Sequence, residues 1–335
     1  QNPVFITPQM IFEVLRSLSS SSFDRIVSEG FDQMKYAETV CEISRKLGVH
    51  VVVPPQDLCL GNRRLNELFV ACVFRTLGSG IEQLSKEEEL EVVTLFDDFD
   101  SGNSREERAF RMWINTLGIS DLYISNLFDG CSDGLVLLKV IDHIEPNFVD
   151  WKNVENPVTN KFKKVANCNY VINLGKQLHF SLVGIGGVDI MGANQTLVLA
   201  YIWQLMRCHI IKFLNDLTVG DKRVTDEQII KWCNTKVSAN SARQMKSFQD
   251  QSLTDSLFFF DLLASVEPRI IDWKLITPGR TKDNLMLNAR YAISIARKLG
   301  ATIFLLPEDI IECKPKMILT FCAAIMAIAL QRQQK

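Results

Sequence analysis

The sequence predicts an all-α protein that is built from repeated copies of one helical unit. The phrase IEPNFVDWK at residues 144–152 returns as VEPRIIDWK at residues 266–274, which is too elaborate to recur by composition alone. Apolar residues ahead of both phrases follow the i, i+1, i+4, i+7 spacing of one helix face. No stretch shows the sustained alternation of a half-buried strand. With 335 residues, of which 47% are hydrophobic and 23% charged, the chain has room for two or three packed domains.

Each full copy is expected to open with a helix that carries a tryptophan. The segment FRMWINTLG at residues 110–118 matches IIKWCNTKV at residues 229–237 in its apolar positions. A pattern typical of a capping box precedes both segments, starting at Ser104 in one copy and at Thr225 in the other, each with Glu or Gln three residues later.

The second helix of each copy is expected to stop at a proline. Pro146 ends the apolar run of SDGLVLLKVIDHIEP, and Pro268 ends that of TDSLFFFDLLASVEP. Proline has no backbone N–H and cannot continue the hydrogen-bond ladder of a helix. An extended turn with Asp-Trp follows both prolines.

Four of the five tryptophans recur in equivalent places. Since a large aromatic side chain commonly fixes an irregular segment on a core, we expect these four to be packing residues: Trp113 with Trp232, and Trp151 with Trp273. Trp203 has no aromatic counterpart in the other copies, which makes it a better candidate for a binding surface.

A third helix, a loop and a long apolar helix complete each copy. The segment at residues 167–180 aligns with that at 288–301, each with a tyrosine at its fourth position. An aspartate then stands eight residues before the first apolar residue of the last helix, and it occurs three times: Asp57, Asp189 and Asp309. This recurrence favours capping of the next turn over catalytic work.

The self-comparison also sets the domain limits. Residues 104–217 and 225–335 are expected to be complete copies, and residues 1–77 the C-terminal half of another copy whose tryptophan helix is missing. Two linkers, 78–103 and 218–224, join the three parts.

Composition gives no sign of a nucleic acid or membrane partner. The formal net charge of −2 provides no overall attraction to nucleic acid or to an anionic membrane. The longest apolar runs, such as MILTFCAAIMAIAL, stop short of the roughly 18 to 20 residues that a bilayer crossing needs. We therefore expect a soluble chain.

The residues that could carry chemistry do not gather into a catalytic or metal-binding pattern. The nine cysteines include no Cys-x-x-Cys and have mostly apolar neighbours, as expected for buried thiols in a reducing compartment. The four histidines have no metal-ligand spacing and no nucleophile motif beside them. The stretch VGIGG lacks the Lys-Ser ending of a P-loop, and DDFDSGN lacks the glutamate that closes a calcium loop. We expect no catalysis, cofactor or metal in this chain.

Three segments carry a family resemblance. The stretches REERAFRMWINTLG (105–118), FSLVGIGGVDIMGANQTLVLAYIWQLMR (180–207) and LLPEDIIECKPKM (305–317) resemble the calponin homology domains of the fimbrin and plastin family, and the resemblance covers nearly the whole chain. Members of that family carry a calcium-binding EF-hand headpiece and then four calponin homology domains arranged as two tandem actin-binding units. The resemblance implies that this chain begins at Gln1 within the second domain and contains the third (104–217) and the fourth (225–335).

The function implied by the resemblance is the cross-linking of actin filaments into bundles. It further implies a non-enzymatic, cytoplasmic monomer of the actin cytoskeleton with filamentous actin as its partner, and calcium only in a headpiece that this sequence lacks. One complete tandem unit should bind filaments without bundling them. The alternative is a calponin homology scaffold that binds tubulin or a signalling protein.

The candidate actin contacts come from what distinguishes the middle copy and from the resemblance. The last helix of the middle copy is apolar like the last helices of the other copies. It also carries polar and basic residues, which suit the acidic surface of actin. The resemblance adds the first helix and the turn after the proline-ended helix. The candidates are Arg105, Arg108, Arg111, Lys152, Gln195, Thr196, Trp203, Gln204, Arg207 and Lys212. The cluster NKFKK at residues 160–164 is a further possible contact.

Overall fold

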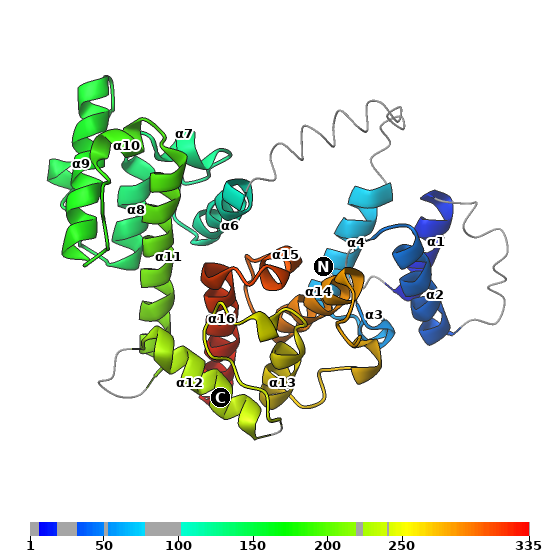
Figure 1. Ribbon diagram of the computed structural model, residues 1–335. Helices are drawn as coiled ribbons and strands as arrows, with labels where there is room; N and C mark the ends of the chain where they lie inside the picture. Colours follow the sequence, from blue (N-terminus) through cyan, green and yellow to red (C-terminus); the bar gives the residue numbers. More distant parts are fainter. Residues whose placement is uncertain are drawn as a thin grey trace. The chain divides into compact units, whose positions relative to one another are not determined.

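The computed structural model describes residues 7–18, 32–49, 53–77, 102–218, 224–239 and 241–334, and all regular structure within these ranges is helical (Figure 1). The all-α prediction is confirmed. Most of both predicted linkers, and residues 97–101 of the DDFDSGN stretch, lie outside the described residues.

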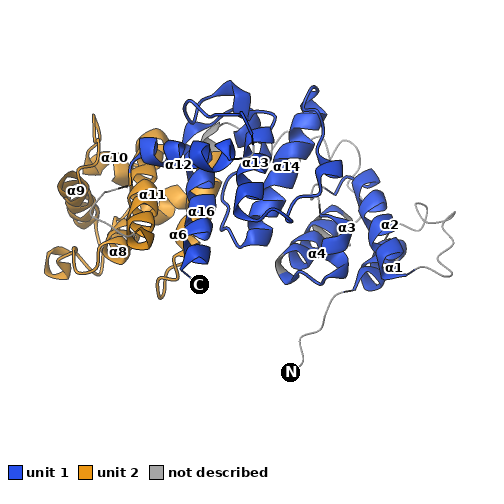
Figure 2. Ribbon diagram, turned by 90° about the horizontal axis from the view of Figure 1, so that it is seen from below, with its two compact units in different colours: residues 1–83, 225–335 blue, residues 84–224 orange. Residues whose placement is uncertain are grey.

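The chain divides into two compact units (Figure 2). Unit 1 combines residues 1–83 with residues 225–335, and unit 2 consists of residues 84–224. The first and last parts of the sequence therefore share one unit, while the middle copy forms the other.

Unit 2 contains the middle copy in the order that the repeat predicts. Its elements are α6 (Gly102–Thr116), α7 (Leu127–Cys131), α8 (Leu135–Ile144), the 3-10 turn η2 (Trp151–Asn153), α9 (Lys161–Gln177), α10 (Gly187–Met191) and α11 (Gln195–Leu217). Apolar faces of α6, α8 and α11 meet in the core, where Phe110, Leu138 and Tyr201 are fully buried. The Tyr201 hydroxyl donates to the backbone oxygen of Val171 at 2.6 Å, so its polar end is satisfied inside the core.

The last copy repeats this order in unit 1. Its elements are α12 (Asp226–Ser238), η3 (Gln251–Leu253), α13 (Leu257–Val266), η4 (Trp273–Leu275), α14 (Lys282–Leu299), α15 (Pro307–Ile311) and α16 (Pro315–Gln333). The capping box predicted at Thr225 is confirmed, because its hydroxyl oxygen accepts from Gln228 N at 3.3 Å and its N–H donates to Gln228 Oε1 at 3.1 Å.

The described residues before the first linker form four helices that also belong to unit 1. They are α1 (Pro8–Leu18), α2 (Gln33–Lys46), α3 (Pro55–Cys59) and α4 (Arg63–Leu77). A core of their own is centred on Phe12, Tyr36, Leu58 and Phe69. On its other side α4 packs against α14 of the last copy (Figure 1).

The capping box predicted at Ser104 is wrong. Helix α6 begins at Gly102, so Ser104 lies inside its first turn instead of before it. The carboxylate that the box would have used has other partners: Glu107 Oε1 accepts from Arg111 Nε at 2.9 Å and from Leu127 N at 3.3 Å. The sequence pattern had the right residue types but did not reveal this competition.

The turn after each proline-ended helix is held by its aspartate and by a tyrosine. Helices α8 and α13 end just before Pro146 and Pro268, as predicted. In the middle copy, Asp150 accepts from Lys152 N at 3.1 Å, and the N–H of Asp150 donates to the Tyr170 hydroxyl at 2.9 Å. In the last copy, the tyrosine hydroxyl and the aspartate of the Asp-Trp turn repeat both bonds.

The core positions expected for Trp151 and Trp273 are wrong. These side chains are 44% and 54% exposed, whereas Trp113 is buried as predicted. The apolar residue before each aspartate, Val149 or Ile271, fills the core in their place. The indole of Trp151 lies on the surface and donates to Asp142 Oδ2 at 3.2 Å.

Helices α11 and α16 are longer than we expected from the apolar runs in the sequence. By length and composition alone, α11 and α16 could each cross a bilayer. In α16 most of the apolar window is buried inside unit 1, as in the core helix of a soluble protein.

Candidate functional site

Helices α6 and α11 lie side by side in unit 2 and carry most of the candidate contact residues (Figure 1). Two aromatic contacts join them. The rings of Phe110 and Trp203 stack with their centroids 6.4 Å apart and an interplanar angle of 24°. Farther along, Trp113 Nε1 donates to His209 Nδ1 at 3.3 Å. These contacts fix α6 and α11 against each other.

Trp203 holds this helix pair together. It is half-buried, and the Phe110 ring covers one of its faces. Its lack of a counterpart in the other copies reflects packing that is particular to α6 and α11. Its assignment as an actin contact stays a prediction.

Helix α6 offers a partly charged outer stripe. Arg108, Met112 and Thr116 are exposed and lie four residues apart, so they share one side of the helix. Arg105 is half-buried, and Arg111 is held by Glu107 at 2.9 Å. Of the three predicted arginines, Arg108 is the most accessible, and Met112 beside it was not predicted from the sequence.

The first two residues of α11 are exposed. Gln195 and Thr196 follow Asn194, whose side chain accepts from Leu197 N at 3.3 Å and so caps the helix. One turn after Trp203, Arg207 is half-buried. Gln204 has an internal role, because its Nε2 donates to the backbone oxygen of Ser181 at 2.9 Å and ties the preceding loop to α11.

That loop was not predicted as part of the site. Val183 and Val188 are both exposed next to the segment that Gln204 holds. The VGIGG stretch is a loop that leads into a short helix, as expected, with Gly184 at φ 68°. No pattern in the sequence indicated exposed valines here, since apolar residues ahead of a core helix are normally expected to be buried.

Lys212 closes the end of another helix. Its ammonium donates to the backbone oxygen of Ile144 at 2.6 Å and pairs with Glu145 Oε2 at 2.7 Å. A cation here compensates the carbonyl groups at the C-terminus of α8. The geometry supports a structural role for Lys212, and its contact with actin remains a prediction.

His209 sits between charged and aromatic groups. Burial lowers the pKa of its imidazole, and the neighbouring His143 and Lys212 lower it further. The bond from Trp113 requires an unprotonated Nδ1, so the neutral ring fits the site. This histidine links the two helices of the candidate surface.

The turn after α8 forms a second exposed region. Lys152 is exposed next to Trp151, and Lys161 is exposed next to Phe162, whose side chain is 87% exposed. Lys163 of the same cluster pairs with Glu155 at 3.0 Å. Two surface aromatics among lysines can give apolar as well as charged contacts to a partner.

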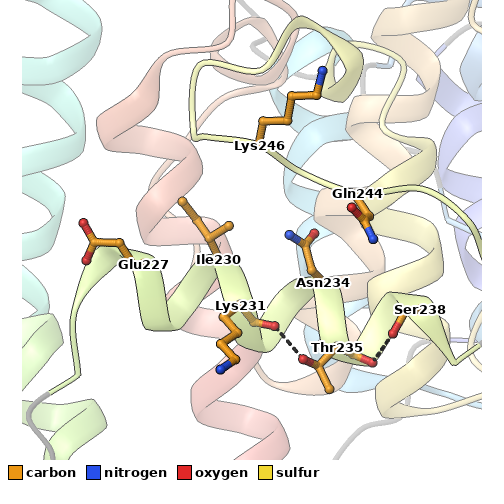
Figure 3. Close-up of a pocket in the computed structure, with 8 residues that line it drawn as sticks. All are labelled: Glu227, Ile230, Lys231, Asn234, Thr235, Ser238, Gln244 and Lys246. Carbon is orange, nitrogen blue, oxygen red and sulfur yellow. Dashed lines mark hydrogen bonds between the residues drawn. The ribbon is translucent and has the colours of Figure 1, made fainter.

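A shallow depression on the last copy contains none of the candidate contact residues. Figure 3 shows that it follows α12 and the segment after it. Three of the polar side chains along it are already bonded: Asn234 exchanges two hydrogen bonds with the backbone of Met245, and the hydroxyls of Thr235 and Ser238 donate to carbonyls of their own helix. These three groups therefore have internal roles.

No group of three or more His, Cys, Asp or Glu side chains within the described residues could hold a metal ion. All nine cysteines are free thiols, and five of them are buried. Burial raises the pKa of Cys131 well above its ordinary value, which disfavours the reactive thiolate.

Comparisons with known proteins agree with the repeat. The model of the calponin homology domain matches residues 104–211 and 223–331. Similar relatives include Fimbrin-5 of Arabidopsis thaliana, 42% identical over 96% of this chain and 46% of the relative, and fimbrin of Schizosaccharomyces pombe, 38% identical over 94% and 51%. Plastin-3 of Homo sapiens is 39% identical over 90% of this chain and 47% of its own length.

A solved structure extends the similarity to three dimensions. The crystal structure of the actin-crosslinking core of S. pombe fimbrin matches 95% of this chain and 64% of that chain, with a TM-score of 0.62 and 35% sequence identity. This chain spans about half the length of the curated relatives that it matches.

Proposed function

Since this chain belongs to the calponin homology family and is similar to fimbrins and plastins along nearly its whole length, we propose that it binds filamentous actin through a tandem pair of calponin homology domains. The observation that carries the proposal is the pair of domain matches in direct succession, together with the likeness to a fimbrin actin-crosslinking core over 95% of the chain. The two domains correspond to residues 104–217 and 225–335.

The contact surface that we assign is the outer side of α6 and α11. Arg108 and Met112 provide a cation beside an apolar side chain on α6, and Gln195 and Thr196 provide polar groups at the start of α11. Lys152 extends the surface onto the turn after α8. An acidic filament would be attracted by the two exposed cations, and the attraction should weaken with salt because exposed charges are screened within about 10 Å at 0.1 M.

In the longer protein, two such tandem units would cross-link filaments into bundles. Residues 1–77 would then be the back half of a calponin homology domain from the first unit, and any calcium response would reside in an EF-hand headpiece outside this sequence. We place the protein in the cytoplasm, on the actin cytoskeleton, as a non-enzymatic monomer that needs no cofactor, nucleic acid or membrane. The composition, the scattered histidines and the identity of the relatives support this.

Co-sedimentation with actin filaments tests the proposal. At high centrifugal force and low salt the chain should pellet with filaments, and the bound fraction should fall as salt is raised. At low centrifugal force, which pellets only bundles, the filaments should stay in solution, because the chain holds one complete tandem unit. Absence from the high-force pellet at low salt would refute actin binding.

The scaffold alternative makes a different prediction for the same co-sedimentation assay. A chain that binds tubulin should pellet with microtubules and not with actin filaments. The relatives that support actin are fimbrins and plastins, and the comparisons give no support to tubulin or a signalling partner.

A further inference from the structure

The three recurring aspartates do not all have the same role. Each is the third residue of a short helix, in α3, α10 and α15. Asp189 Oδ2 accepts from the N–H of Gly186 at 2.8 Å, and Asp309 Oδ2 accepts from the N–H of Leu306 at 2.8 Å. In these two copies the aspartate is a capping residue, as expected, but it caps the start of its own short helix and not the turn that follows it.

Asp57 cannot form this bond, because the capping position of α3 is Pro54. Proline has no backbone N–H, so the donor that Gly186 and Leu306 supply is missing. The carboxylate of Asp57 is nevertheless only 2% exposed. Among the described residues, its Oδ2 has no hydrogen-bond donor. An ionised carboxylate in such a place needs a cation.

The last copy supplies this cation. Lys298 on α14 forms an ion pair with Asp57 Oδ1, and its side chain is mostly buried. Beside it, burial lowers the pKa of the Arg297 guanidinium, with Cys72 of α4 among its neighbours. Two successive basic residues of α14 therefore lie against α3 and α4.

The corresponding lysine of the first segment behaves differently. In the shared motif Arg-Lys-Leu-Gly, Lys46 of α2 takes the place of Lys298. Lys46 is exposed and pairs with Glu42 one turn earlier on its own helix, at 2.7 Å. The middle copy has Gln177 at this position. Only Lys298 reaches a different copy of the repeat.

We propose that Asp57 and Lys298 form an intramolecular latch, and that Pro54 makes it possible by removing the donor that would otherwise occupy Asp57. The latch fixes the interaction surface between the first segment (α1–α4) and the last copy of the repeat. Its partner is thus another part of the same chain. The proposal does not depend on actin binding.

Two physical properties follow from the burial of this pair. Loss of Lys298 leaves a buried carboxylate without a cation, which costs more than loss of a surface pair. Salt screens buried pairs much less than exposed ones. The contact between the first segment and α14 should therefore persist at salt concentrations that weaken exposed pairs such as Arg63 with Glu67.

Hydrogen exchange of the amides in residues 53–77 tests the latch. Lys298→Met should speed exchange there by about tenfold or more, since a buried charge loses its partner. Lys46→Met removes the same charge from the matched position and should leave exchange unchanged. Amides of α16 serve as an internal reference for the fold of the last copy. Unchanged exchange at residues 53–77 in Lys298→Met would overturn the proposal.

The pair itself is tested by a double-mutant cycle. Asp57→Asn and Lys298→Met should each speed exchange, and the double variant should be far less impaired than the product of the two single effects. If a single variant fails to fold, recovery of the fold in the double variant supports the latch. Independent, multiplicative effects, or a double variant that also fails to fold, would count against it.

A third variant tests the role of proline. Pro54→Leu places at this position the residue that the last copy has at Leu306, and it restores a backbone N–H that competes with Lys298 for Asp57. Exchange at residues 53–77 should increase, and Lys298→Met should then have a smaller additional effect than in the parent chain. An equal effect of Lys298→Met in both backgrounds would refute the role assigned to Pro54.

Discussion

The final helices of the two complete copies, α11 and α16, occupy the same place in the fold but differ in how much surface they leave exposed. In α16, the residues from Met317 to Ala323 are all buried, and burial continues to Ala329. In α11, Gln195 and Thr196 are exposed, and the buried residues form one stripe that begins at Val198. One inward face is enough to build the domain. The outer face of α11 is therefore free to differ, and it is part of the surface that we propose for actin binding.

The largest effect is expected where α11 meets α9. A Cβ atom at Gly175 would lie 2.8 Å from the ring of Tyr201, which is buried and hydrogen-bonded and cannot move aside. Gly175→Ala should lower the free energy of unfolding of unit 2 by about 1–3 kcal/mol, because overpacking forces backbone shifts.

The last copy provides the control for this change. It has Ala296 at the matching position, where it is fully buried, so α14 and α16 accommodate the methyl group. Ala296→Gly should destabilise unit 1 by a smaller amount. Thermal unfolding of both variants measures the difference between the two stability changes. If Gly175→Ala did not lower the stability of unit 2, the two helix pairs would pack alike.

The next effect concerns binding. Arg108→Glu reverses an exposed charge on α6 and should weaken co-sedimentation with actin roughly three- to tenfold, mainly at low salt. The matched control is Lys231→Glu, an exposed charge on α12 of the last copy. If both reversals weakened binding equally, the partner surface would not be confined to the middle copy.

A smaller effect should separate structural from contacting residues. Lys212→Met removes the cation that closes α8 and should destabilise unit 2 by about 1 kcal/mol. Actin affinity of the folded variant should be unchanged. The exposed Lys176 on α9 provides a control for the loss of one charge, because Lys176→Met should alter neither property. A loss of affinity in Lys212→Met without a change in stability would restore Lys212 as a contact.

The smallest effect is a pH dependence in unit 2. Because the folded-state pKa of His209 is lowered, the unfolded chain binds its proton more readily. The contribution to stability is present above the ordinary pKa of about 6.5 and is lost as pH falls through that value toward the folded pKa. His209→Gln should flatten this slope in chemical denaturation series relative to the parent chain. A slope unchanged by His209→Gln would assign the dependence to other groups.

The sequence was sufficient for features that depend on neighbouring residues. The proline-ended helices, the Thr225 capping box and the caps at Asp189 and Asp309 all follow from local hydrogen-bond chemistry. Such bonds span three or four residues, so a repeated motif predicts them where the helix starts at the expected residue and the backbone donor is present; Ser104 and Asp57 are the exceptions.

Features that depend on distant partners were not predictable in the same way. The recurrence of Trp151 in the last copy predicted a core residue, but Val149, two positions earlier, fills the core. The sequence predicted a surface cation at Lys212, but its ammonium bonds to the end of α8. Even the repeated aspartate changes its role in one copy, because a proline three residues earlier removes its donor.

Unit 1 is built from two segments that lie far apart in the sequence, and this separation affects how the chain can fold. During synthesis α4 leaves the ribosome long before α14, and unit 2 is completed between them. During synthesis, domains generally fold as units from the N-terminal side. The surface of α3 and α4 around Asp57 therefore stays uncovered until α14 has been made. Bringing these distant segments together also carries a loop-closure cost. We therefore expect protection of residues 53–77 to appear last in refolding, after both complete copies of the repeat have formed.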